Sequence, residues 1–333
     1  MIEKYSTRRQ FLNLGKLSLL FLLNSCSNSS KKISISLQRA FYPQSLKDTL
    51  PSSWQQESID FSKLELEKNK KILSNSDFIL IKDGWINTIN FESFQKINDL
   101  FPNDLLNKRS KDFLKSFKEY QINKLFPIGV VPFAVIIKNN KDLINDASNS
   151  WDFLLDEKLK EKIIFPQSPR IIMSISKKIN AKNSLRKLKG QTMLFDDQNS
   201  INWLINSKAS VAIIPYSQCV KYLKIDSRLS IVFPKNGVPL SWNFLLSKSK
   251  INNQILIEWI KSFEDRNTID ELANQGWYLP FSNEYSQNKY NINIKNNNLG
   301  PSKICWENSW SFSPLNNKEK FNLENLWNES LAP

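Results

Sequence analysis

The feature that most constrains the fold of this chain is the alternation of short apolar runs with amphipathic segments. Continuous apolar runs predict buried strands, and apolar residues spaced three and four apart predict helices. The expected strands cover residues 33–37, 78–81, 130–137, 163–165, 192–195, 211–214, 229–233 and 238–247. The expected helices cover residues 44–57 with a break at Pro51, 64–73, two stretches within 91–118, 151–160, 170–179, 197–206, 216–223, 251–263 and 267–275. This alternation is typical of an α/β protein with parallel strands.

Parallel sheets also indicate where a ligand binds, because ligands of such sheets lie at the carboxyl ends of the strands. Five loops follow the predicted strands closely enough to line such a site. They are residues 41–44, 82–85, 167–170, 216–218 and 240–243.

The first 26 residues have the pattern of an export signal. The Arg-Arg pair within residues 7–12 resembles a twin-arginine signal. The apolar run 17–23 has the length of a signal-peptide core and is shorter than the ~20 residues that span a bilayer. Residues 23–26 resemble a lipobox, which predicts lipidation of Cys26 and a lipid-anchored protein on the periplasmic or extracytoplasmic face of the membrane. The alternative is an uncleaved anchor with an incidental cysteine.

Composition excludes several classes of activity. The 333 residues include no histidine, which removes Ser-His-Asp and Cys-His catalysis and the commonest transition-metal ligand. No G-x-S-x-G motif is present, and no carboxylate pair stands out, although a glycosidase that uses only Asp and Glu stays open. We therefore expect no enzyme, no cofactor and no metal site.

The net charge of +14 comes from scattered lysines rather than a dense basic block, so we expect no nucleic acid partner. A basic exported protein could favour anionic lipid or an anionic ligand. Cys219 and Cys305 are left after Cys26, and they could form a disulfide or remain buried thiols.

Five stretches, taken in order, carry a family resemblance. They are residues 75–81 (NSDFILI), 150–154 (SWDFL), 209–216 (ASVAIIPY), 233–237 (FPKNG) and, more weakly, 275–280 (QGWYLP). Together they resemble the extracellular solute-binding proteins of ABC importers, most closely the spermidine/putrescine-binding type. The likeness spans residues 33–282. Each motif is short and apolar, and their order is more specific than any one of them.

The resemblance implies a two-lobed periplasmic-binding-protein fold of type II, in which each lobe is a mainly parallel sheet flanked by helices. It divides the chain into a signal peptide 1–26, a linker 27–32, a first lobe 33–137 and 244–282, a second lobe 138–243, and a tail 283–333. The chain is expected to cross between the lobes near residues 136–138 and 242–246, and the tail to pack on the second lobe.

Polyamine binders of this family hold ammonium groups with carboxylates and methylenes between aromatic rings. The matching carboxylate positions here are Ser168, Ile171 and Asn243, so those acids are absent. Asp83 is the best remaining acid on a cleft loop, with residues 196–197 as weaker candidates.

Aromatic and basic residues complete the candidate site. Trp85 and Trp277 fall on site tyrosines of the family, and the other aromatic candidates lie on or beside cleft loops; each could instead pack in the core. Arg170 is the expected partner of a carboxylate or phosphate, and Lys82 is either a second anion contact or a solvated lysine. The candidate ligand-binding residues are Tyr42, Asp83, Trp85, Arg170, Tyr216, Trp242, Asn243 and Trp277.

The resemblance therefore predicts a monomeric substrate-binding lipoprotein that captures a small solute and delivers it to ABC permease subunits. The solute is polyamine-like or another small charged organic molecule. The alternative is a membrane-tethered lipoprotein of the same fold with a structural or assembly role and no transport.

Overall fold

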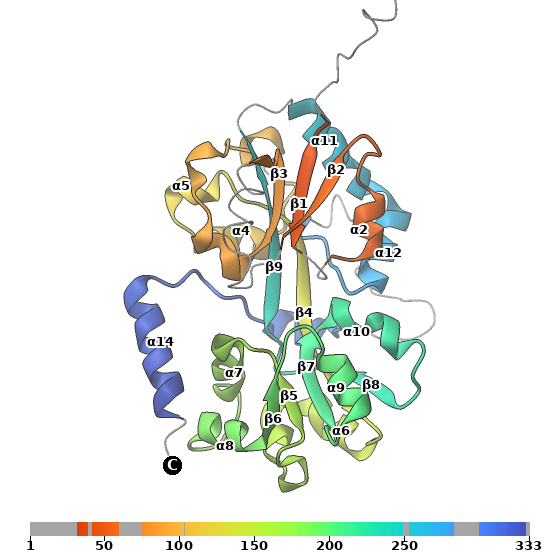
Figure 1. The fold of residues 1–333 in the computed structure, drawn as a ribbon, viewed down its shortest axis with the longest axis vertical. Coiled ribbons are helices and arrows are strands. Elements are labelled where there is room, and N and C mark those ends of the chain that lie inside the picture. The colour runs from red at the N-terminus through yellow and green to blue at the C-terminus, as the bar shows by residue number, and fades with distance from the viewer. Residues whose placement is uncertain are drawn as a thin grey trace, which may run out of the picture.

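Two α/β lobes joined by two long strands make up the protein (Figure 1). The computed structural model describes residues 32–38, 42–59, 75–102, 104–248, 253–282 and 300–330. The predicted two-lobed α/β fold is confirmed, with a sheet that mixes parallel and antiparallel strand pairs where mainly parallel sheets were expected. The export signal, Cys26 and the helix expected at 64–73 lie outside the described residues.

The first lobe is built on a sheet in the order β2-β1-β3-β9-β4. Its strands are β1 (Ser34–Gln38), β2 (Gln55–Ile59), β3 (Phe78–Lys82), β9 (Leu240–Ser247) and the first part of β4 (Phe126–Lys138). The outer strands pair in parallel, whereas β3, β9 and β4 pair antiparallel. Its helices are α2 (Gln44–Asp48), α4 (Lys108–Leu114), α5 (Glu119–Ile122), α11 (Asn253–Lys261) and α12 (Arg266–Asn274).

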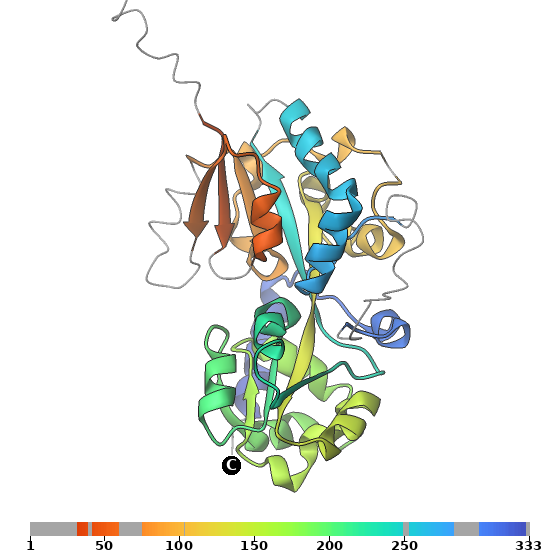
Figure 2. The same cartoon turned by 90° about the vertical axis from the view of Figure 1, so that its right-hand side faces the viewer.

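Strand β3 shows why this sheet is buried on both faces. Phe78 and Leu80 pack into the core under α2, α11 and α12, on the face turned toward the viewer in Figure 2. Ile79 and Ile81 point the other way, into the core that includes α4. All four side chains are fully buried, which accounts for the uninterrupted apolar run.

The second lobe continues the same sheet from β4 through β7, β5 and β6, with β8 also on β4. Its own strands are β5 (Ile163–Phe165), β6 (Thr192–Phe195), β7 (Val211–Pro215) and β8 (Leu229–Val232). Its helices are α6 (Asp142–Asn149), α7 (Pro169–Ser176), α8 (Ser184–Gln191), α9 (Ser200–Asn206) and α10 (Tyr216–Leu223). Residues 151–159 form two short 3₁₀ helices where one α-helix was expected.

Strand β4 passes from the first lobe to the second at one proline, Pro132. Strand β4 pairs with β9 as far as Pro132, opposite Leu240, and from Phe133 it pairs with β7. Proline has no N–H for a ladder, so the change of partner falls where no bond is lost. Both crossings thus come earlier in the chain than the expected 136–138 and 242–246, because a continuous apolar run does not reveal where a strand changes partner.

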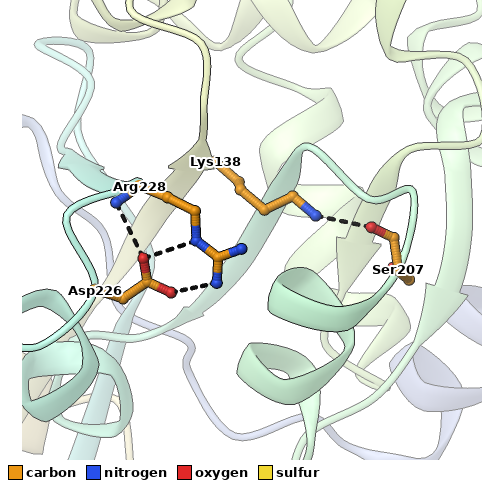
Figure 3. A network of polar contacts seen from close by, with 4 residues as sticks. All are labelled: Lys138, Ser207, Asp226 and Arg228. Atoms are coloured by element: carbon orange, nitrogen blue, oxygen red, sulfur yellow. Dashed lines mark hydrogen bonds and ion pairs between the residues drawn. The ribbon is translucent and has the colours of Figure 1, made fainter.

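Two sets of polar contacts lie at the far end of β4 in the second lobe (Figure 3). Lys138 Nζ donates to the backbone carbonyl of Ser207 at 2.8 Å. Arg228 donates through Nε and Nη2 to the two carboxylate oxygens of Asp226, at 2.9 and 2.7 Å. These Arg228 hydrogen bonds lower the pKa of Asp226 to about 2.

Two segments differ from the sequence expectation. The helix expected over 44–57 is only α2 followed by the edge strand β2, whose polar residues hide its strand character. The poorly patterned tail forms α13 (Lys303–Asn308) and α14 (Asn317–Glu329). Helix α14 lies against the second lobe, where Lys189 Nζ donates to the carbonyl of Trp327.

Cys219 and Cys305 are both buried free thiols, so of the two alternatives left open by the sequence the structure shows buried thiols rather than a disulfide. Across the described ranges, no helix combines the length and apolar character that a bilayer crossing requires.

Replacing Gly129 by alanine tests the packing of β4. A Cβ at Gly129 would lie inside the indole of the fully buried Trp277, so Gly129→Ala should destabilise the fold by about 1–3 kcal/mol. Gly190→Ala in α8 is the control, because a Cβ there meets no atom and alanine favours helix by up to about 1 kcal/mol. Urea unfolding of both variants measures the difference, and equal midpoints would contradict the packing described.

Candidate functional site

A row of first-lobe side chains lies at the junction between the lobes. Lys82 is the cross-strand neighbour of Asn243, and Asn243 is the neighbour of Gly129, so their side-chain positions share one face of the sheet. Trp277 covers Gly129 on that face, and its ring centroid lies 5.4 Å from that of Tyr42. We call Lys82, Asn243, Trp277 and Tyr42 the first-lobe row.

Two members of the first-lobe row bury polar groups that have no hydrogen-bond partner among the described residues. The Asn243 side chain is fully buried, and neither its Oδ1 nor its Nδ2 is paired. The Tyr42 hydroxyl is also buried and unpaired. Trp277, in contrast, donates from Nε1 to the carbonyl of Ile128 at 3.2 Å. Leaving such a group unsatisfied costs about 1–3 kcal/mol, so these positions demand a polar partner.

The second lobe faces this row with an acid and an aromatic ring. Asp197, between β6 and α9, is near enough for its charge to raise the pKa of Lys82. Its Oδ1 accepts the N–H of Gln167 at 3.0 Å. The Tyr216 ring lies so close to Gly276 that a Cβ there would overlap it, and Gly276 has the left-handed φ of 76° that glycine tolerates.

Trp242 lies on the opposite face of β9, and Asp83, the residue that directly follows β3, is hydrogen-bonded beside it. Asp83 accepts hydrogen bonds from the backbone N–H groups of Gly84, at 3.1 Å, and Trp242. The Trp242 ring stacks on Phe113 at 4.8 Å. Arg170, at the start of α7 in the second lobe, is near enough for its charge to act on Asp83. On this face too, an acid of the first lobe, Asp83, therefore lies within electrostatic reach of a base of the second lobe, Arg170.

Burial shifts the ionisation of the charged groups toward neutrality. It raises the pKa of Asp83 to about 7, although the two backbone N–H groups and the charges of Lys82 and Arg170 oppose the shift. It lowers the pKa of Lys82 to about 7 against the charges of Asp83 and Asp197. Burial also raises the pKa of Asp197. Perturbed pKa values of this kind are concentrated at functional sites.

The tail adds a third connection between the lobes, and we call residues 309–316 the interlobe tail. Figure 1 shows it leaving the centre of the molecule for α14. The backbone carbonyl of Trp310 accepts the N–H of Leu240 at 2.9 Å, and the Trp310 N–H donates to the carbonyl of Val238 at 3.1 Å. Ser311 Oγ accepts the Trp242 indole N–H at 2.7 Å. Arg170 lies over Phe312 at 5.0 Å and donates to the carbonyl of Ser313.

A pocket of about 450 Å³ opens beside the interlobe tail. Its lining is Lys108, Arg109, Asp112, Phe113 and Ser311. Within the described ranges, no three His, Cys, Asp or Glu side chains gather closely enough to hold a metal ion.

Solved structures provide the comparison, since no family model and no curated protein matches the sequence. A spermidine/putrescine ABC transporter protein from Listeria monocytogenes is 16% identical with a TM-score of 0.60, covering 90% of this chain and 98% of its own. The TpPotD lipoprotein of Treponema pallidum is 13% identical with a TM-score of 0.61, over 90% and 98%. An ABC transporter substrate-binding protein from Agrobacterium tumefaciens is 11% identical with a TM-score of 0.62, over 92% and 96%.

The chain has the fold of the ABC-importer solute-binding proteins. At these identities the likeness shows the fold alone, and what this chain binds must come from its own residues.

Within this solute-binding-protein fold, the candidate residues separate onto two faces. Tyr42, Asn243 and Trp277 belong to the first-lobe row, which Tyr216 approaches from the second lobe. The remaining candidates lie on the other face or beside it. Those are Asp83, Arg170 and Trp242, together with Trp85, which is partly buried and packs against the larger core.

Sequence reasoning missed the contribution of the tail. Ser311, Phe312 and Ser313 contact Trp242 and Arg170, and Asn87 Nδ2 donates to the carbonyl of Leu315 at 3.3 Å. No periodic or motif signal marks this segment, since it is short and without regular structure between two helices.

The raised pKa of Asp83 predicts a pH-dependent gain from Asp83→Asn. The folded state binds the Asp83 carboxyl proton more tightly than the unfolded state, so the contribution of this group to stability falls as pH rises from about 4 to about 7. The asparagine variant lacks this loss and should be the more stable protein above about pH 7, with a difference that shrinks toward pH 4. Thermal unfolding across this range measures it, with the exposed Asp270→Asn as a control that stays near wild type. A constant difference at all pH values would contradict the assignment.

Proposed function

We propose that the protein is the solute-binding component of an ABC importer, which takes up a small charged organic solute between its lobes. The unpaired Asn243 amide carries this proposal. It is fully buried where the lobes meet, yet it offers both a donor and an acceptor that the described residues leave unused. A solute that supplies both partners removes the penalty of burying this amide.

The arrangement of the lobes supports the same function. The first-lobe row presents Lys82, Asn243 and Tyr42, and the second lobe presents Asp197 and Tyr216. A solute that bonds to both sides stabilises the closed arrangement of the lobes, and closure of this kind is a known mode of solute capture. No covalent chemistry is required of these residues, in keeping with a binding protein rather than an enzyme.

Delivery and location follow from the same proposal. Two of the similar structures carry names that refer to spermidine/putrescine transport or its binding protein. We propose that this chain likewise serves ABC permease subunits as a monomer. Lipidation at Cys26 would hold it on the extracytoplasmic face of the membrane. The missing carboxylates at Ser168, Ile171 and Asn243 argue against simply carrying over a polyamine as the solute.

A thermal-shift screen of the purified protein tests solute binding. The panel contains polyamines, amino acids, organic acids, phosphate and quaternary amines. A solute that binds only the folded state adds about 2.7 kcal/mol of stability at a hundredfold excess over its dissociation constant, so its signature is a selective rise in the unfolding midpoint. A flat response from a well-folded protein would instead support a structural or assembly role without transport.

Asn243→Leu should separate stability from binding. Removing the unpaired amide without changing the side-chain size much should raise the solute-free stability by about 1–3 kcal/mol and abolish the solute-induced shift. Asn274→Leu, at an exposed position in α12, is the matched control and should leave the shift intact. A variant at Asn243 that still binds the solute would show that the amide does not contact it.

A further inference from the structure

The first-lobe row contains its own cation beside its unpaired amide. Lys82 and Asn243 are direct cross-strand partners, so their Cβ atoms lie about 4.5–5.5 Å apart on one face. An ammonium and a carboxamide N–H on neighbouring side chains offer two donors. A carboxylate with its two oxygens suits such a pair, and the ammonium makes the hydrogen bond charge-assisted.

Both lobes supply a negative charge near Lys82, the first through Asp83 and the second through Asp197. Asp197 lies near Lys82, and its Oδ1 already accepts the N–H of Gln167. A carboxylate accepts several hydrogen bonds, so capacity remains for an ammonium donor. The rings of Tyr42 and Trp277 continue the row beyond Asn243, and aromatic faces accept methylenes or a cation.

Arg170, a second cation at the junction, is held by the interlobe tail. Arg170 donates to the carbonyl of Ser313 and lies over the ring of Phe312. The interlobe tail thus takes up the guanidinium that sequence analysis favoured for an anionic group. Lys82 is the cation on the strand position directly beside the unpaired amide of Asn243.

We infer that the solute is a small zwitterion, whose carboxylate pairs with Lys82 and Asn243 and whose ammonium pairs with Asp197. This inference rests on the proposed function and narrows it. A diamine would place a second ammonium beside Lys82, and like charges in a partly buried site repel. A dicarboxylate would meet Asp197, with Asp83 also nearby.

Proton uptake gives the inference an independent signature. Burial lowers the pKa of Lys82 to about 7, so part of the protein carries a neutral amine near neutral pH. A carboxylate placed beside it favours the ammonium form and raises that pKa. Asp83, Asp197 and Arg170 are the other charged groups that act here. Pairing of Asp197 with the solute ammonium would lower the pKa of that carboxyl and release a proton. The variant Lys82→Met is therefore needed to assign any proton uptake to Lys82.

Matched solutes make the decisive measurement. Each amino acid is compared with the amine that loss of its carboxylate leaves, such as ornithine with putrescine and lysine with cadaverine, by isothermal titration calorimetry on the purified protein. 4-Aminobutyrate, putrescine and succinate form a further series, in which a four-carbon chain carries one charge of each sign, two positive or two negative. In whichever set of matched solutes binds, the zwitterion should bind at least tenfold more tightly than the corresponding amine. Titrations in buffers of different ionisation enthalpy should show that binding of the zwitterion takes up protons.

Variants assign the preference to the named groups. Lys82→Met should remove both the tenfold preference and the proton uptake, whereas Lys82→Arg, which keeps the charge, should retain the preference. Lys208→Met is the control, because Lys208 is exposed on the second lobe, where it pairs with the exposed Glu161 at 3.3 Å. Asp197→Asn should weaken the zwitterion more than a monocarboxylate of the same length.

The outcomes separate this inference from the proposed function. The inference that the solute is a zwitterion would be overturned if putrescine or cadaverine bound more tightly than the matching amino acid. It would also be overturned if only solutes without a carboxylate bound. In both cases solute binding itself would be established. A zwitterion preference that survives Lys82→Met would overturn the assignment to Lys82. Absence of binding by every solute, with the protein folded, would overturn both.

Discussion

The antiparallel pairing of β4 with β9 is the constraint on which the rest of the structure depends. Both strands are almost wholly buried, so their backbone groups must pair with each other or with neighbouring strands. Beyond this pairing β4 continues into the second lobe, and the registers of β3, β9 and β4 align Lys82, Asn243 and Gly129 across three adjacent strands. A one-residue slip would turn Asn243 to the opposite face and bring Trp242 into its place. The position of the site is therefore fixed by the sheet rather than by loops.

The junction combines a well-satisfied core with a few groups that are poorly satisfied. The packed faces of β3 hold the first lobe together without any polar contribution from their side chains. Against this background the protein retains an unpaired amide, an unpaired hydroxyl, and charged groups whose pKa values burial has moved toward neutrality. Such departures from good folding rules are typical of sites that evolution keeps for binding, at the expense of stability.

Much of the fold could be predicted because its central strands are strongly patterned. The apolar runs at β3 and β7 mark buried strands, and the order of elements indicates two lobes. β2 escaped prediction because an edge strand with the sequence QQESI lacks an apolar face. Helix α14 escaped because it has no buried residue from which an amphipathic pattern could be recognised.

The site could be predicted only in part, for a similar reason. Loops after strands drew attention to Asp83 and Arg170, and the structure places these two charged groups within electrostatic reach of each other. The pairing of Lys82 with Asn243 depends on strand register between segments 161 residues apart in the sequence, and local patterns contain no information about it. The tail contacts at Arg170 depend on a segment without regular structure. Long-range register and irregular chain are the two features that a single sequence specifies least.

The interlobe tail also sets a limit on motion. Trp310 is bonded beside the crossing strands and α14 is packed on the second lobe, while Asn87 of the first lobe bonds to the carbonyl of Leu315. An extended chain reaches only about 3.3–3.6 Å per residue, so the few residues between these attachments can span only a short gap. Rotation of the lobes therefore has a maximum arc, set by the length of this segment, beyond which the tail must detach from one lobe. Lengthening or shortening it by single residues would change that arc while leaving the sheet, the core and the first-lobe row untouched.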